Sequence, residues 1–203
     1  PGFIVRGKGC HVWDADGNKF IEYGMGLRSV TLGHAYKPVL DAAYLQMQLG
    51  ANFTRPTPIE LECAEALQSL VEGAEMVKFG KNGSDATTAA VKLARAHTGR
   101  DMVAVCADQP FFSTDDWFIG STVMSAGIPD AIRRLTVKFP YNDMEGLKAL
   151  FREYPDRIAC IVMEAETVNE PKEDYLQQVH GVCKEHGALF VLDEMITGFR
   201  WHL

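Results

Sequence analysis

Two short segments of the sequence carry polar residues where buried strands are predicted to end. Residues 80–86, GKNGSDA, form a glycine-rich turn that delivers Ser84 to the start of a predicted helix. Free backbone N–H groups and the positive end of a helix dipole make such a turn an anion site, and a phosphate group is the anion that we expect there. The alternative is an ordinary glycine turn in which Ser84 serves only as the helix N-cap.

The second segment is ALFVLDEMITGFR, residues 188–200, in which an apolar run leads directly into Asp193 and Glu194. Asp193 stands where the predicted strand ends, so it could cap a turn, hold a metal ion or pair with a cationic group of a ligand. A hard metal ion needs several oxygen ligands, and the sequence offers only Glu164 and Glu166 at a neighbouring strand end. A carboxylate that faces one protonated ring nitrogen needs no further ligand, so we predict a ligand cation and no metal.

These segments require a framework that brings strand ends together. From residue 76 onwards the sequence alternates apolar strands with amphipathic helices, which indicates a parallel sheet with helices on both faces. In such a sheet, ligands bind at the edge formed by the carboxyl ends of the strands. The predicted strands are residues 76–80, 102–106, 158–164 and 188–193, and the predicted helices between them are residues 84–98, 142–153 and 173–186.

The N-terminal part of the chain has a different pattern. Residues 3–23 alternate in the manner of antiparallel strands, with a hairpin turn at Asp16-Gly17 or Gly17-Asn18. Two helices are predicted to follow, at residues 38–49 and 58–72, because each begins at a proline and is followed by a glycine. The expected fold class is therefore α/β, with an antiparallel annex at the N-terminus.

The composition excludes several classes of function. With 203 residues and 47% hydrophobic content, the chain can bury a core. A formal net charge of -7 argues against a nucleic-acid partner, since binding phosphates along a duplex requires a clustered basic surface. Membrane-spanning helices need about 20 apolar residues, and neither such a run nor a signal peptide is found, so we expect a soluble, cytoplasmic protein without a membrane partner. The five scattered cysteines predict free thiols.

A phosphate site at one strand end and an isolated acid at another fit a ligand that combines a phosphate with a basic heteroaromatic ring. Pyridoxal 5'-phosphate (PLP) is such a molecule. Its ring nitrogen must stay protonated for the ring to draw electrons from a substrate carbanion. Asp193, held at the end of a buried strand, would keep that nitrogen protonated, and we therefore predict that it is catalytic.

Four stretches of the sequence together resemble the class III, fold-type-I aminotransferases, particularly the glutamate-1-semialdehyde 2,1-aminomutase group. The stretches are VWDADGNKFIEY, LGHAYKPV, KNGSDATTAAVKLARAHTGR and LFVLDEMITGFR, in this order. The resemblance implies a β-hairpin segment of the small domain with its linker at residues 1–37. It also implies a PLP-binding large domain of the PLP-transferase fold at residues 38–203, lacking its C-terminal part, and a homodimer.

The same resemblance implies roles for individual residues around the cofactor. The backbone of Gly83 and Ser84 would hold the cofactor phosphate, with Asn82 in the same turn. Asp193 would pair with the pyridine nitrogen, and Met195 takes the place of a residue that packs against the ring.

Three further residues complete the implied site. Glu164 matches an acid that supports the site from the end of the preceding strand. Where the family has Tyr-His-Gly after the second strand, this chain has Phe111-Phe112-Ser113, so Phe111 can stack on the ring but offers no hydrogen-bonding group. Arg28 lies where the family lines its substrate pocket and could bind a substrate carboxylate, although a solvated loop arginine is the alternative.

One departure from the family concerns the lysine that forms the Schiff base with the cofactor. In the family this lysine lies beyond the segment that matches DEMITGFR, and none of the ten lysines of this sequence occupies that position. We therefore expect that the sequence is the N-terminal and central part of a longer enzyme.

Three hypotheses for the function follow. The first is a PLP-dependent aminotransferase that moves an amino group between an amino acid and a carbonyl substrate by ping-pong chemistry. The second is an aminomutase of the glutamate-1-semialdehyde type. The third, from another class, is a catalytically inactive module that keeps the fold and binds without turnover. The sequence does not identify the amino donor or the carbonyl acceptor.

Overall fold

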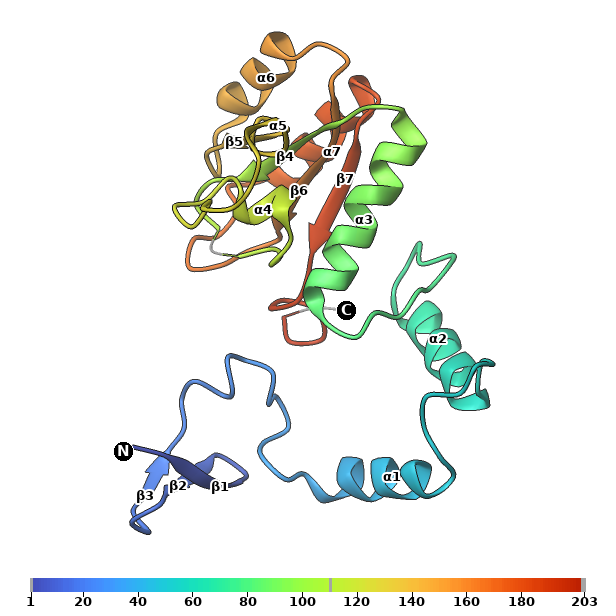
Figure 1. Cartoon of the computed structure of the whole chain (residues 1–203), viewed down its shortest axis with the longest axis vertical. Coiled ribbons are helices and arrows are strands. Elements are labelled where there is room, and N and C mark those ends of the chain that lie inside the picture. The colour runs from blue at the N-terminus through green and yellow to red at the C-terminus, as the bar shows by residue number, and fades with distance from the viewer. Residues whose placement is uncertain (1, 110, 202–203) are drawn as a thin grey trace. The chain divides into compact units, whose positions relative to one another are not determined.

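The structure is a computed structural model that describes residues 2–109 and 111–201 (Figure 1). Internal contacts divide the chain into two compact units, an N-terminal unit of Pro1–Val77 and a C-terminal unit of Lys78–Leu203. The predicted domain boundary after residue 37 differs from this division into units, and it stays a prediction.

The N-terminal unit begins with an antiparallel sheet of three strands in the order β1-β2-β3. The Asp14 carboxylate shapes the β2–β3 hairpin, since its Oδ1 accepts the N–H groups of Asp16 and Asn18 at 3.1 and 2.8 Å. The predicted antiparallel annex is thus confirmed. Its strands are β1 (Ile4–Lys8), β2 (His11–Asp14) and β3 (Lys19–Ile21).

Two helices follow the sheet, as the sequence predicted. They are α1 (Lys37–Gln48) and α2 (Pro58–Leu70), and each has a proline in its first turn. At the start of α2 the Glu60 carboxylate accepts the N–H of Thr57 at 2.7 Å, which is one bond of a capping box. Neither helix has a buried residue among those described. The apolar side chains of α1, such as Leu45, are therefore exposed.

A left-handed turn lies between β3 and α1. Met25, Gly26, Leu27 and Arg28 have φ angles of 47°, 58°, 55° and 70°, and the N–H of Arg28 donates to the carbonyl of Gly24 at 3.0 Å. The left-handed conformation costs an L-residue about 1–2 kcal/mol. Three residues with side chains share this turn, so the conformation needs support from outside it.

The C-terminal unit contains a parallel sheet of four strands in the order β5-β4-β6-β7. Three of its strands match predicted strands to within one residue. The fourth, β5, was not predicted, because four residues are too few to show a clear periodic pattern. The strands are β4 (Met102–Cys106), β5 (Thr136–Phe139), β6 (Ile158–Glu164) and β7 (Leu189–Asp193).

The strand predicted at residues 76–80 was wrong. These residues carry no strand assignment, and the side chains of Met76 and Phe79 are exposed. An apolar alternation favours extended backbone, but a strand also needs a neighbour with which to exchange hydrogen bonds. Within the described part of the chain, no strand pairs with this segment.

Helices cover both faces of the parallel sheet. The side chains of β4 alternate between the two faces, and Figure 1 shows α3 lying along β7 on one of them. Met102 and Ala104 pack with α6 and α7, whereas Val103 and Val105 pack with α3 and α4. The predicted α/β class with a two-sided parallel sheet is therefore confirmed. The helices are α3 (Gly83–Thr98), α4 (Asp116–Ile119), α5 (Asp130–Arg133), α6 (Met144–Glu153) and α7 (Tyr175–Glu185).

All five cysteines are free thiols, as predicted. Cys106, Cys160 and Cys183 are buried, and Cys10 and Cys63 are exposed. Burial raises the pKa of the Cys160 and Cys183 thiols to about 12. The buried thiols therefore stay protonated and contribute to the core as small apolar side chains.

Candidate functional site

The glycine-rich turn leads directly into α3. Asn82 is the N-cap of this helix, because its Oδ1 accepts the N–H of Asp85 at 2.9 Å and its Nδ2 donates to the Asp85 carboxylate at 3.1 Å. Gly83 and Ser84 are the first two residues of the helix, and N–H groups at these positions have no partner within a helix. The N-cap is thus Asn82 and not Ser84. The start of α3 has the donors and the dipole orientation that an anion requires.

Hydrogen bonds fasten the loop that follows β4 to the start of α3. Ser84 Oγ accepts the N–H of Thr114 at 3.0 Å, and Thr87 Oγ1 donates to the carbonyl of Phe112 at 2.7 Å. Both bonds join residues that are 25 or more positions apart in the sequence. The loop is therefore held at a fixed place beside the glycine-rich turn.

This loop presents one aromatic ring to solvent. Phe112 is buried, whereas Phe111 is 49% exposed. The Phe111 ring stands edge-on to Phe118 with 5.5 Å between ring centroids. Phe118 thus supports the Phe111 ring from one side, and an exposed part of the ring remains available to a planar ligand.

Asp193 is the last residue of β7 and is half-buried. Its Oδ1 accepts the N–H of Met195 at 2.8 Å. Burial raises the pKa of the Asp193 carboxyl, and the hydrogen bond from Met195 opposes this shift only in part. The ion pairs found among the described residues do not include Asp193. A cationic group of a ligand beside this carboxylate would stabilise its charged form.

Met195 lies next to the glycine-rich turn. A Cβ atom built on Gly83 would be 3.0 Å from Met195 Cε. The segment that follows β7 therefore meets the first residue of α3, although residues 83 and 195 are far apart in the sequence. The structure brings the predicted phosphate turn and the predicted acid segment to the same edge of the C-terminal unit.

Glu164 ends β6 and stands opposite Asp193 in the register of the two parallel strands. It is buried, and its backbone is held by a residue that the sequence did not single out. Gln109 donates from Nε2 to the Glu164 carbonyl and accepts the Glu164 N–H at Oε1, both at 2.8 Å. This pair of bonds ties the loop after β4 to the end of β6. The only signal in the sequence is the position of Gln109 just after a strand at the ligand-binding edge.

Arg28 belongs to the N-terminal unit, where it lies exposed in the left-handed turn. Its predicted contact with a substrate carboxylate stays a prediction. Among the described residues, no group of three or more His, Cys, Asp or Glu side chains could hold a metal ion.

Comparisons with known proteins relate the whole chain to one family. The family model for aminotransferase class-III matches residues 1–200. The glutamate-1-semialdehyde 2,1-aminomutase of Sulfurihydrogenibium azorense is 36% identical over 98% of this chain and 50% of its own length. The corresponding protein of Anaeromyxobacter sp. (strain Fw109-5) is also 36% identical, over 98% of this chain and 49% of its own length. This chain thus spans about half the length of the curated relatives it matches.

Solved structures have the same fold. The PLP internal aldimine form of the FumI protein of Sphingopyxis sp. MTA144 matches with a TM-score of 0.90 and 33% identity, over 98% of this chain and 49% of that chain. An omega-transaminase from Sphaerobacter thermophilus matches with a TM-score of 0.89 and 25% identity, over 97% of this chain and 49% of that chain. Since the family model covers nearly every residue, the chain belongs to the class-III aminotransferase family.

Proposed function

We propose that the protein is a PLP-dependent aminotransferase, which moves an amino group between a small-molecule amino donor and a carbonyl acceptor. One observation carries this proposal. The start of α3, with helix N–H groups that lack an internal partner, meets the segment that follows the half-buried carboxylate of Asp193. Membership of the class-III family and the PLP form of the FumI structure support the choice of cofactor.

The residues at this edge fit the two ends of the cofactor. The N–H groups of Gly83 and Ser84 suit the phosphate, because the positive end of the α3 dipole favours negative charge. Asp193 suits the protonated ring nitrogen. Burial raises the pKa of its carboxyl group, and a cation beside it would stabilise the charged carboxylate. Bound there, PLP would supply an electron sink for a carbanion of the substrate.

The remaining residues would hold or orient groups around the cofactor. Asp193 would keep the proton on the ring nitrogen, with its own direction fixed by the N–H of Met195. Phe111 and the side chain of Met195 would pack against the ring and exclude water. Glu164 would support the site from the end of β6, and Arg28 would bind a substrate carboxylate through its two-pronged guanidinium group.

An aminomutase of the glutamate-1-semialdehyde type is the second candidate. The 36% identity to two proteins of that name favours it. The two reactions differ in stoichiometry, since an aminotransferase consumes a donor and an acceptor in equal amounts. An aminomutase converts one substrate without an external acceptor. Assays of the full-length protein with a panel of amino acids, with and without 2-oxo acids, distinguish the two.

Asp193→Ala in the full-length protein tests the proposed role of this carboxylate. We expect turnover to fall by about 100-fold or more, on the scale seen when one electrostatic group of an active site is removed. Circular dichroism should show that the fold is kept. Glu194→Ala is the matched control, because Glu194 is the exposed neighbour of Asp193. Wild-type rates in Asp193→Ala would remove this residue from the mechanism.

We further propose a homodimer, as the family resemblance implies, and a location in the cytoplasm. No helix of the described residues is long and apolar enough to cross a membrane. Light scattering of the purified full-length protein measures the oligomeric state, and a monomeric mass would contradict the homodimer. Fractionation of the source cells tests the location, and recovery in the membrane pellet would contradict it.

A further inference from the structure

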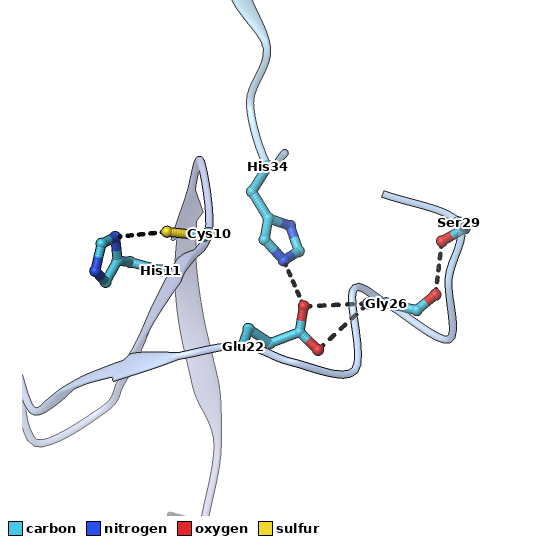
Figure 2. Close-up of polar contacts among 6 residues, drawn as sticks. All are labelled: Cys10, His11, Glu22, Gly26, Ser29 and His34. Carbon is cyan, nitrogen blue, oxygen red and sulfur yellow. Dashed lines mark hydrogen bonds and ion pairs between the residues drawn. The ribbon is translucent and has the colours of Figure 1, made fainter. Parts of the chain in front are cut away.

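Two residues outside the proposed cofactor site hold the left-handed turn of residues 25–28. Both carboxylate oxygens of Glu22 accept the N–H of Gly26, at 3.3 and 3.1 Å (Figure 2). The Glu22 Oε2 also lies 3.1 Å from His34 Nε2, in a hydrogen bond that becomes an ion pair when the imidazole is protonated. Glu22 thus joins the turn to His34. We call Glu22 and His34 the latch.

His34 is itself fixed to the antiparallel sheet. Its backbone exchanges two hydrogen bonds with Gly9, at 2.8 and 2.9 Å, in an isolated antiparallel bridge. Its ring lies directly on the backbone of Gly7 in β1, where an added Cβ would be only 2.7 Å from the ring carbon Cγ. The side chain of His34 therefore has a rigid support, and Glu22 transmits that support to Gly26.

Side-chain packing does little to hold the turn in place. Leu27 is 92% exposed and Met25 is 43% exposed. The bonds within the turn are local, such as those from the Ser29 hydroxyl to the Gly26 carbonyl at 2.6 Å and from the Val30 N–H to the Met25 carbonyl at 2.9 Å. Local bonds close the turn but do not fix it relative to the sheet. The latch does so, because it joins the Gly26 N–H to His34 and His34 is bonded to Gly9.

We propose that Glu22 and His34 are positioning residues that hold the left-handed turn and thereby fix the direction of Arg28 for the carboxylate of the substrate. Backbone held in a rarely populated conformation is typical of binding sites, where the surrounding structure maintains it. Arg28 is one of the left-handed residues, with a φ of 70°, so the path of its side chain depends on the turn. The inference rests on the proposed function, in which Arg28 binds the substrate.

Glu22→Leu in the full-length protein removes the acceptor of Gly26 and the partner of His34 while keeping the approximate size of the side chain. Hydrogen exchange measures the turn without any need for activity. We expect exchange at the Gly26 N–H to become roughly tenfold faster or more, because this group loses its bond to the carboxylate. Glu22→Gln, which keeps one oxygen for the Gly26 N–H, should show a smaller change. Unchanged exchange in Glu22→Leu would overturn the latch.

Steady-state kinetics then measure the effect on Arg28. For a substrate that carries a carboxylate, we expect Glu22→Leu to raise KM roughly tenfold with little change in kcat, the pattern of lost binding in both ground state and transition state. A matched substrate without the carboxylate should keep its KM. The control is Asp41→Asn, which removes an exposed ion pair to Lys37 in the same unit and should alter neither exchange nor KM.

A double substitution separates the latch from the proposed function. If the latch acts through Arg28, then Glu22→Leu combined with Arg28→Gln should raise KM no further than Arg28→Gln alone. Additive effects on KM would overturn the positioning role. If Arg28→Gln leaves every KM unchanged, then the substrate role of Arg28 fails, and with it this inference. Exchange at Gly26 still reports whether Glu22 holds the turn. A lack of turnover with every donor and acceptor would overturn the proposed function and the role of Arg28, whereas faster exchange in Glu22→Leu would still support the latch.

Discussion

The two units of the molecule fix their functional residues in different ways. In the C-terminal unit, Glu164 stands at the end of β6, in which every residue is buried, and Asp193 stands at the end of the neighbouring β7, in which most residues are half-buried. In the N-terminal unit, Val12 and Asp14 alone are buried among the described residues. The left-handed turn that carries Arg28 is held by the latch and by local hydrogen bonds. A packed core thus positions one set of residues, and a few polar contacts position the other.

This difference predicts where the chain tolerates substitution. A buried apolar side chain contributes to stability through many contacts at once, so its loss is felt throughout the unit. A polar contact between half-exposed groups contributes little to global stability but can determine a local conformation. Substitutions in the C-terminal unit should therefore change stability most, and substitutions near the latch should change local order most.

The largest contrast is expected for truncation of apolar side chains. Ile161 in β6 is fully buried, so Ile161→Ala should lower the free energy of unfolding by about 2–5 kcal/mol. Leu45 in α1 is 62% exposed, so Leu45→Ala should change the free energy of unfolding by less than about 0.5 kcal/mol. Urea unfolding followed by circular dichroism measures both values. Equal losses of unfolding free energy in the two variants would contradict this contrast between the units.

The next contrast concerns side-chain amides that bond to backbone groups. Gln109→Leu leaves the buried N–H and carbonyl of Glu164 without these partners, and we expect a loss of about 1–3 kcal/mol. Gln68 offers the matched case in the N-terminal unit, since its Nε2 donates to the carbonyl of Glu75 in an exposed setting. Gln68→Leu should cost about 0.5 kcal/mol or less. A Gln109→Leu protein as stable as Gln68→Leu would show that the buried pair of bonds is dispensable.

Glycine substitutions test the left-handed turn. Glycine adopts positive φ without the penalty of about 1–2 kcal/mol that an L-residue incurs, so Leu27→Gly should leave stability unchanged or slightly raised. In the helix α1, by contrast, Leu40→Gly should lower stability by about 1 kcal/mol. Both leucines are exposed, which makes lost packing a minor factor in either variant. Thermal unfolding measures the two changes, and a loss of stability in Leu27→Gly would contradict the left-handed assignment.

The smallest expected effect is a dependence of stability on pH. Burial raises the pKa of Asp193 in the folded protein, so the folded state favours the protonated carboxyl. The wild-type carboxylate therefore destabilises the cofactor-free protein most above that raised pKa, and the effect declines as the pH falls from there to below the ordinary pKa of the carboxyl group. Asp193→Asn should make the cofactor-free protein more stable at neutral pH, and this gain should shrink in acid. A gain that is the same at every pH would exclude ionisation of Asp193 as its cause.

Much of the fold could be predicted because its elements follow from local periodicity. The helices α1, α2 and α3 and the strands β4, β6 and β7 lie within about two residues of their predicted ends. The secondary-structure predictions failed where a segment is a strand only if another strand pairs with it. Residues 76–80 have the apolar pattern of a strand but no neighbour in the described structure, whereas β5 is short and is a strand because it pairs with β4.

The sequence could predict only those site residues that lie at the end of a strand or at the start of a helix. Asp193 and the turn at Gly83 and Ser84 follow the ends of apolar runs or precede a helix, and such positions are visible in a sequence. Gln109 could not be found in this way, because its bonds reach a backbone 55 positions further along the chain. The latch was missed for the same reason, since His34 is 12 positions from Glu22 and only the fold brings them together.

The contact between the Gly7 backbone and the His34 ring has a consequence for how the family can diverge. A larger residue at position 7 would occupy the space of the imidazole, because an added Cβ would lie only 2.7 Å from its Cγ. Descendants of this sequence should therefore change position 7 only together with position 34, or change neither. An alignment of many relatives would record this constraint as correlated replacement at the two positions.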